Sequence, residues 1–162
     1  MFRSLVLVSV LAITAAVNGT TIHVDATNCP GPGDGSVGDP YCSIQTAIDN
    51  AVDTDEIVVA PGTYFETIDF LGKAIWLHSS DGPDVTVIDA QQVGTVVTCD
   101  SGEEADTTLD GLTITGGFGH GGGMVIDGSN PTVRNCRFIG NTGDPSGGAV
   151  LARDFSSVSF TG

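Results

Sequence analysis

Few side chains in this sequence have the type and spacing that catalysis requires, and His120 is the first to consider because it stands between Gly119 and Gly121. An imidazole can accept or donate a proton near neutral pH. Hydrolysis of a glycosidic bond with inversion, however, needs two carboxyl groups, one on each side of the bond. A lone histidine in a glycine-rich run cannot supply them. We therefore expect His120 to be a turn residue without a catalytic role.

A lyase that eliminates across a uronate would need acidic side chains around Ca²⁺ and an arginine or lysine to take the proton. Arg134 and Arg137 are the candidates for the base, but no acidic cluster surrounds them, so we expect solvated surface. The acidic stretch 100–106, with Glu103 and Glu104, lacks the alternating Asp-x-Asp loop that positions Ca²⁺ ligands. We expect an extended loop there, with Ca²⁺ binding as the alternative.

Two aromatic residues have the kind of side chain that stacks on sugar rings. Both Trp76 and Tyr64 occur in apolar runs typical of strands, which favours packing in the core or the cap. The sequence has no zinc-ligand spacing, phosphate-binding loop or nucleophile elbow. It therefore predicts no catalytic, cofactor-binding or metal-binding residue.

The N-terminus has the pattern of a secretory leader. Arg3 precedes an apolar run over 5–17, which is shorter than the roughly 20 residues of a membrane span, and small residues follow it. We expect a signal peptide at 1–19, a secreted or cell-surface protein, and no membrane span in the mature chain. An uncleaved anchor helix is the alternative.

The charge of the mature chain limits its partners. Without Arg3, 4 basic and 20 acidic residues remain, giving a net charge of −16. Such a surface repels nucleic acid and anionic lipid. It also repels acidic polysaccharides, unless divalent cations bridge the two.

Four cysteines in an exported chain suggest disulfide bonding. Cys29 and Cys42 flank a loop rich in glycine and proline, where a cross-link would reduce the entropy of the unfolded chain. We predict a disulfide between them. Cys99 and Cys136 lie in apolar segments and are predicted to be buried free thiols.

One amphipathic helix is predicted before the strands begin. Apolar residues recur at helical spacing over 44–52, ending at Val52, and Ser43 is placed to cap the N-terminus. An apolar strand over 56–60 follows, ended by Pro61 and Gly62. From Lys73 onward the sequence shows only short strand-like runs separated by turn residues.

These runs repeat about every two dozen residues. Residues 109–117 align with 133–141 at a shift of 24, and 155–162 follow at a shift of 22, while the Gly-Gly marker at 122 recurs at 147. Stacked coils bring equivalent side chains into contact, so each column should be chemically alike. The predicted core columns are Leu109, Val133 and Phe155; Leu112, Cys136 and Val158; and Ile114, Phe138 and Phe160. The predicted corners are Gly111, Asn135 and Ser157, and Gly117 and Asn141.

Two sets of motifs resemble known proteins. The segments 44–48 and 55–64, which end in Pro61-Gly62-Thr63-Tyr64, resemble the N-terminal cap of the pectin-lyase-like superfamily. The Gly-Gly and Phe-x-Gly-Asn markers resemble repeats of the polymorphic outer membrane protein type. The resemblance implies an all-β, right-handed parallel β-helix (solenoid) with an amphipathic capping helix.

This resemblance also implies the domain organisation. It places the cap at 20–72, with the helix closing the bottom of the stack, and the coils at 73–162. The last marker stops before its Asn, so we expect an incomplete stack of three to four coils. Polygalacturonases of the same superfamily contain a Gly-His-Gly motif, but their clustered aspartates have no equivalent here.

Three functions are compatible with this pattern. The first is a non-catalytic exported module, of surface or adhesion type, whose partner is a polysaccharide or a cell-surface protein. The second is the N-terminal part of a polysaccharide lyase or glycoside hydrolase with its active site beyond residue 162. The third, binding of ice or mineral by a repetitive face, lacks a regular Thr-x-Thr ladder.

Overall fold

Strands of two to four residues alternate with turns throughout the computed structural model, which describes residues 19–162. The predicted leader therefore lies outside the described residues, apart from Gly19. Most strands belong to three parallel sheets. Sheet 1 consists, in order, of β1 (Thr21–Val24), β2 (Glu56–Val59), β5 (Trp76–Ser79), β8 (Thr108–Asp110), β12 (Thr132–Arg134) and β16 (Ser159–Thr161).

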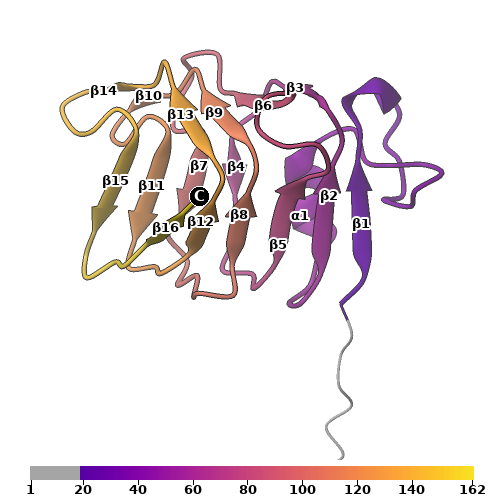
Figure 1. Ribbon diagram of the computed structural model, residues 1–162, viewed down its shortest axis with the longest axis horizontal. Coiled ribbons are helices and arrows are strands. Elements are labelled where there is room, and N and C mark those ends of the chain that lie inside the picture. The colour runs from indigo at the N-terminus through magenta and orange to yellow at the C-terminus, as the bar shows by residue number, and fades with distance from the viewer. Residues whose placement is uncertain (1–18) are drawn as a thin grey trace, which may run out of the picture.

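The chain passes from sheet 1 to the other two sheets and back. Sheet 2 consists of β3 (Gly62–Tyr64), β6 (Thr86–Asp89), β9 (Thr113–Thr115) and β13 (Arg137–Ile139). Sheet 3 consists of β4 (Ile68–Asp69), β7 (Val97–Cys99), β11 (Met124–Asp127) and β15 (Val150–Arg153). A short pair, β10 (Phe118–Gly119) and β14 (Thr142–Gly143), joins two of the turns. The result is four stacked coils, from β1 at one end to β14 and β15 at the other (Figure 1), which confirms the parallel β-helix.

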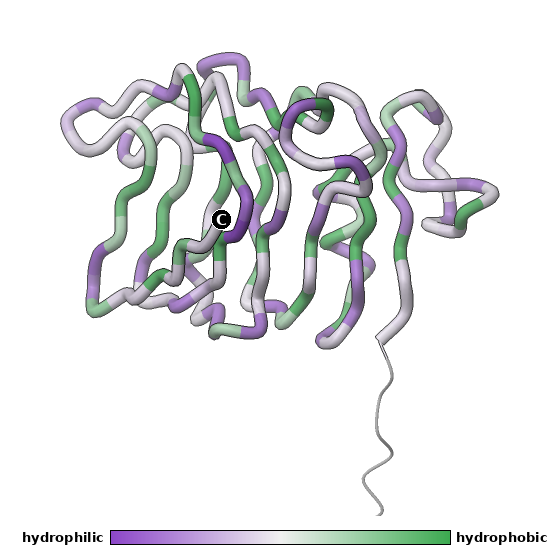
Figure 2. Tube along the Cα trace, in the orientation of Figure 1, coloured by the Kyte–Doolittle hydropathy of each residue, from purple (hydrophilic) through white to green (hydrophobic). Residues whose placement is uncertain are grey.

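The core lies inside the three sheets because alternate residues of each strand point inward. In β5, Leu77 is fully buried while its neighbours Trp76 and His78 point outward. Hydrophobic residues accordingly recur along the strands of the coils (Figure 2). The innermost column of sheet 1 contains Ile22, Ile57, Leu77, Leu109, Val133 and Phe160.

The coils differ in length although the strands stay in register. Along that column successive residues are 20, 32, 24 and 27 positions apart, from Ile57 to Phe160. Turns absorb the difference, since they lie on the surface and tolerate insertion. A constant repeat length is therefore a poor guide to register in this chain.

The predicted alignment of the last repeat is wrong for this reason. Val133 pairs with Phe160, so Phe160 belongs to the sheet 1 column and not to that of Ile114 and Phe138. Phe155, expected in the core, is fully exposed in a turn with φ of 64°. Val158 is half-buried but precedes β16, so it does not stack on Cys136.

The predicted alignment of the Gly-Gly marker is also wrong, by one residue. Met124 pairs with Val150, a shift of 26, whereas the marker predicted 25. A shift of one residue exchanges the two faces of a strand. The backbone ladder thus selects the register that turns Val150, and not Ala149, toward the core side occupied by Met124.

The other predicted stacks are observed. Leu109 pairs with Val133, and Ile114 pairs with Phe138. Leu112 is fully buried, and the half-buried Cys136 packs against the core.

Two turn positions adopt the left-handed conformation that the corners require. Gly111 has φ of 72° and Asn135 has φ of 50°, which confirms two members of the first corner. The third, Ser157, is wrong: it lies before β16, out of register with Asn135, and is not left-handed. In the second corner the left-handed residue is Gly140, one position before Asn141. Asn141 stabilises that corner through its side chain, which accepts from Gly117 N at 2.9 Å.

Helix α1 (Ile44–Asn50) closes the β1 end of the stack, where it contacts β1, β2 and β4. Ser43 caps it as predicted, its Oγ accepting from Thr46 N at 3.2 Å. Glu66 adds a second cap, with its carboxylate accepting from Ile44 N at 2.8 Å. No helix within 19–162 is long and apolar enough to cross a membrane.

The helix is shorter than the apolar pattern predicts. It ends at Asn50, and Ala51 is already extended, with ψ of 154°. The chain therefore leaves the helical path before Val52, which is 58% exposed and does not join the buried stripe. The buried members are Ile44, Ala47, Ile48 and Ala51.

The cysteines pair as expected. Cys29 and Cys42 form a disulfide, with Cα atoms 5.1 Å apart. Cys99 is a buried free thiol, and Cys136 is free but only half-buried. Burial raises the pKa of both thiols, that of Cys136 to about 11, which keeps them protonated and unreactive at neutral pH.

Candidate functional site

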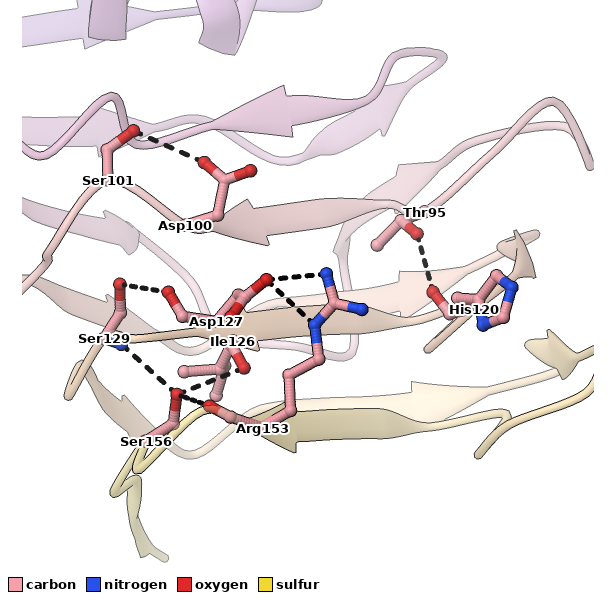
Figure 3. A network of polar contacts seen from close by, with 9 residues as sticks. All are labelled: Thr95, Asp100, Ser101, His120, Ile126, Asp127, Ser129, Arg153 and Ser156. Carbon is pink, nitrogen blue, oxygen red and sulfur yellow. Dashed lines mark hydrogen bonds and ion pairs between the residues drawn. The ribbon is translucent and has the colours of Figure 1, made fainter.

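His120 lies in the turn between β10 and β11, exposed to solvent. Its backbone carbonyl accepts from Thr95 Oγ1 at 3.0 Å (Figure 3). Within residues 19–162 no hydrogen bond or ion pair reaches its imidazole. The carboxylate of Asp127, at the far end of β11, is engaged by Arg153, through Nε at 2.8 Å and Nη2 at 2.6 Å. His120 thus has no acid or base partner with which to work.

The two candidate arginines lie on different sheets. The corner at Asn135 separates them and places Arg134 in β12 and Arg137 in β13. Arg134 Nε lies 3.6 Å from Asp110 Oδ2 on the neighbouring coil. Arg137 pairs with Asp84. Both arginines are therefore paired, and they do not converge on one site.

The acidic stretch contributes a buried link between coils. Glu103 is fully buried, and its carboxylate accepts from Gly72 N at 2.8 Å and Ser129 Oγ at 2.8 Å. Ser129 N in turn donates to Ser156 Oγ at 3.2 Å (Figure 3). This chain of contacts, the Glu103 ladder, joins the corner between sheets 3 and 1 across all four coils. Among the described residues no group of three or more His, Cys, Asp or Glu is placed to hold a metal ion.

A cavity of about 600 Å³ lies at the capped end beside the disulfide. Its walls include Tyr64, which is buried and donates to Ala60 O at 2.9 Å. Burial raises the pKa of Tyr64 to about 12. The charged group in this cavity, Glu66, is fully engaged by the N-terminus of α1. Tyr64 packs as predicted, and the cavity offers no free charged group.

Trp76 differs from the expectation. The apolar run around it suggested core packing, but the alternation in β5 turns Leu77 inward and leaves Trp76 40% exposed on the outer face of sheet 1. Its ring stacks on that of His78, with centroids 4.1 Å apart and planes 24° apart. The alternation of inward and outward residues along this short strand would have predicted that Trp76 points outward.

Polar partners fix the orientation of His78. Its Nε2 lies 2.9 Å from Glu56 Oε1, and its Nδ1 lies 3.1 Å from the carbonyl oxygen of Ser79. Both partners are acceptors, so an imidazolium can donate to both while a neutral ring donates to one. The hydrogen bond with His78 lowers the pKa of Glu56, and Thr21 Oγ1 donates to the same carboxylate at 3.0 Å.

The same outer face continues into a groove. A cavity of about 180 Å³ lies at the carboxyl ends of β1, β2 and β5. Val37 and Pro40, from the loop between the two disulfide cysteines, form one side of it. The whole lining is His23, Val24, Asp25, Val37, Pro40, Val58, Ala60 and Ser80.

Comparison with known proteins adds no assignment. No family model, no curated protein and no solved structure matches this chain. The outer face of sheet 1 around Trp76 is therefore the candidate site on its geometry alone.

Proposed function

We propose that this chain is an exported, non-catalytic β-helix module of surface or adhesion type, related to the pectin-lyase-like proteins and to polymorphic outer membrane protein repeats, that contacts carbohydrate through the outer face of sheet 1. The observation that carries the proposal is the exposed indole of Trp76, held against His78 on a face lined by polar side chains. The leader pattern supports export to the cell surface or the medium.

The chemistry of this face suits a sugar. The indole offers a flat apolar surface to the C–H face of a pyranose ring, and an aromatic side chain loses little entropy on binding. Beside it, the carboxylate of Glu56 and the hydroxyl of Thr21 can bond to sugar hydroxyls. The net charge of −16 expected for the mature chain, with 4 basic and 20 acidic residues, opposes acidic glycans, so neutral or basic sugars are the preferred ligands.

Binding of the full chain to immobilised neutral and basic polysaccharides tests the proposal. Replacing Trp76 with Ala should weaken retention about tenfold, because the stacking surface is lost. Phe118→Ala is the matched control, since Phe118 is 46% exposed but lies on β10, outside sheet 1. Equal retention of the two variants, or no retention of the wild-type chain on any glycan, would contradict the proposal.

The alternative is that these coils belong to a polysaccharide lyase or glycoside hydrolase whose active site lies beyond residue 162. It rests on the sequence resemblance and has no support from the paired arginines or from His120. Incubation of the full-length protein with pectate, alginate and neutral glycans, with and without Ca²⁺, distinguishes the two. New unsaturated or reducing ends would favour the enzyme.

A further inference from the structure

Trp76 and the 180 Å³ cavity belong to one continuous surface. The outward residues of β5 and its extension are Trp76, His78 and Ser80, and Ser80 lines the cavity. Four residues of strand span about 13 Å, at roughly 3.3 Å per residue. A ligand that reaches both places must therefore be longer than one sugar ring.

The groove that contains them has a side wall held by a disulfide and by backbone hydrogen bonds. Its side wall, the loop that carries Val37 and Pro40, is closed by the Cys29–Cys42 disulfide. His23 anchors this loop to β1, donating from its N to Gly35 O at 2.8 Å. A preformed wall reduces the entropy that binding would otherwise cost.

Negative charge predominates along the groove. Asp25, Glu56 and Asp110 lie on its face, and Asp110 is paired with Arg134. Asp25 lines the cavity itself, and its Oδ1 accepts from Thr27 N at 2.8 Å. Within residues 19–162 no hydrogen bond reaches its other oxygen, which leaves one carboxylate oxygen for a cationic donor.

We propose that this groove binds an oligosaccharide of amino sugars with free amines, with one ring on Trp76 and an ammonium group at Asp25. The proposal rests on the carbohydrate-binding function proposed above and specifies its ligand. Charge complementarity favours free amines, because an ammonium group is attracted to the carboxylates, whereas an acetylated nitrogen carries no charge.

Calorimetric titration of the full chain with two probes tests this ligand class. The probes are the β-1,4-linked tetramer of glucosamine and its fully N-acetylated counterpart. We expect the amine tetramer to bind about tenfold more tightly at low salt, and this preference to shrink at high salt as the charges are screened. A glucosamine dimer should bind more weakly than the tetramer, because it cannot span from Trp76 to the cavity.

Two variants separate this proposal from the general one. Asp25→Asn keeps an oxygen for Thr27 but removes the charge, and it should abolish the preference for the amine. Asp144→Asn is the control, because Asp144 is an exposed carboxylate in the turn between β14 and β15. Equal affinity for both tetramers, or an unchanged preference in Asp25→Asn, overturns this ligand while Trp76-dependent binding still supports the general function. If neither tetramer binds, both proposals fail.

Discussion

The interior of sheet 1 and its β16 end share the same inward column but bury it very differently. Leu77, in the interior of the stack, is fully buried, whereas Phe160, in β16, is 54% exposed. Leu77 has a strand on each side and α1 closes the stack beyond β1, whereas β16 pairs with β12 alone among the described strands. In a solenoid, burial therefore depends on the number of neighbouring coils more than on the residue type.

The largest effect should come from breaking the interior of this column. Leu77→Ala removes a fully buried side chain and should lower the free energy of unfolding by about 3 kcal/mol. Phe160→Ala removes a larger side chain but should cost less than about 1 kcal/mol, because half of it is already in water. Urea denaturation of the mature chain measures both. Equal losses would show that the β16 end is packed as well as the interior.

The disulfide at the capped end should have the next largest effect. Its half-cystines are 13 residues apart, and closing a loop of this size stabilises a fold by about 3 kcal/mol. The double variant Cys29→Ser, Cys42→Ser should lose much of this in thermal unfolding, as should the reduced wild-type chain. Full stability after reduction would mean that the loop's backbone bonds to β1 hold it without the cross-link.

A carboxylate at the same end should make stability depend on pH. Asp55 is almost fully buried, and although burial acts in the opposite sense, hydrogen bonds from Val52 N and from Thr20 hold its pKa below 3.8. The stabilisation is therefore complete above the unfolded pKa, about 3.9, and is lost as pH falls through the lower folded value. Asp55→Asn should cost about 2 kcal/mol at pH 7 and flatten this acid dependence.

Unfolding curves recorded across the acid range measure this pH dependence of stability. Asp106→Asn is the control, because Asp106 is exposed in a turn and its replacement should leave the profile unchanged. An unaltered acid limb in Asp55→Asn would contradict the assignment.

The smallest effects should come from ion pairs between later coils. Arg134 and Asp110 lie 3.6 Å apart, whereas Arg153 contacts Asp127 through two nitrogens at 2.8 and 2.6 Å. Double-mutant cycles should give a coupling energy of roughly 0.2 kcal/mol for the first pair and no more than about 1 kcal/mol for the second. A larger coupling in the looser pair would reverse this order.

The sequence predicted the elements better than their register. Side-chain chemistry alone located the Ser43 cap and the disulfide, because a cap and a cross-link depend on local spacing. The pairing of Leu109 with Val133 was predicted correctly because these two coils differ by the 24 residues of the repeat. Phe155 and Phe160 were misplaced because turn residues were added in the next coil, and turn length leaves no periodic signal.

The candidate site was missed for a related reason. Trp76 was assigned to the core from the apolar character of its neighbours, although its position relative to Leu77 decides its direction. His78 and Glu56 are 22 residues apart, and only the parallel pairing of β2 with β5 brings them together. The groove also requires the fold of the disulfide loop, which the sequence marked only as rich in glycine and proline.

The Glu103 ladder has a mechanical consequence. Coils stack along the long axis, so tension along that axis acts on the bonds between neighbouring strands. Hydrogen bonds connect successive coils along one corner, and the strongest are those that the buried carboxylate accepts. The connected residues are Gly72, Glu103, Ser129 and Ser156. A module that holds a surface against flow would carry part of the load through this corner, and extension should begin beyond Ser129, where neutral hydroxyl contacts replace the carboxylate.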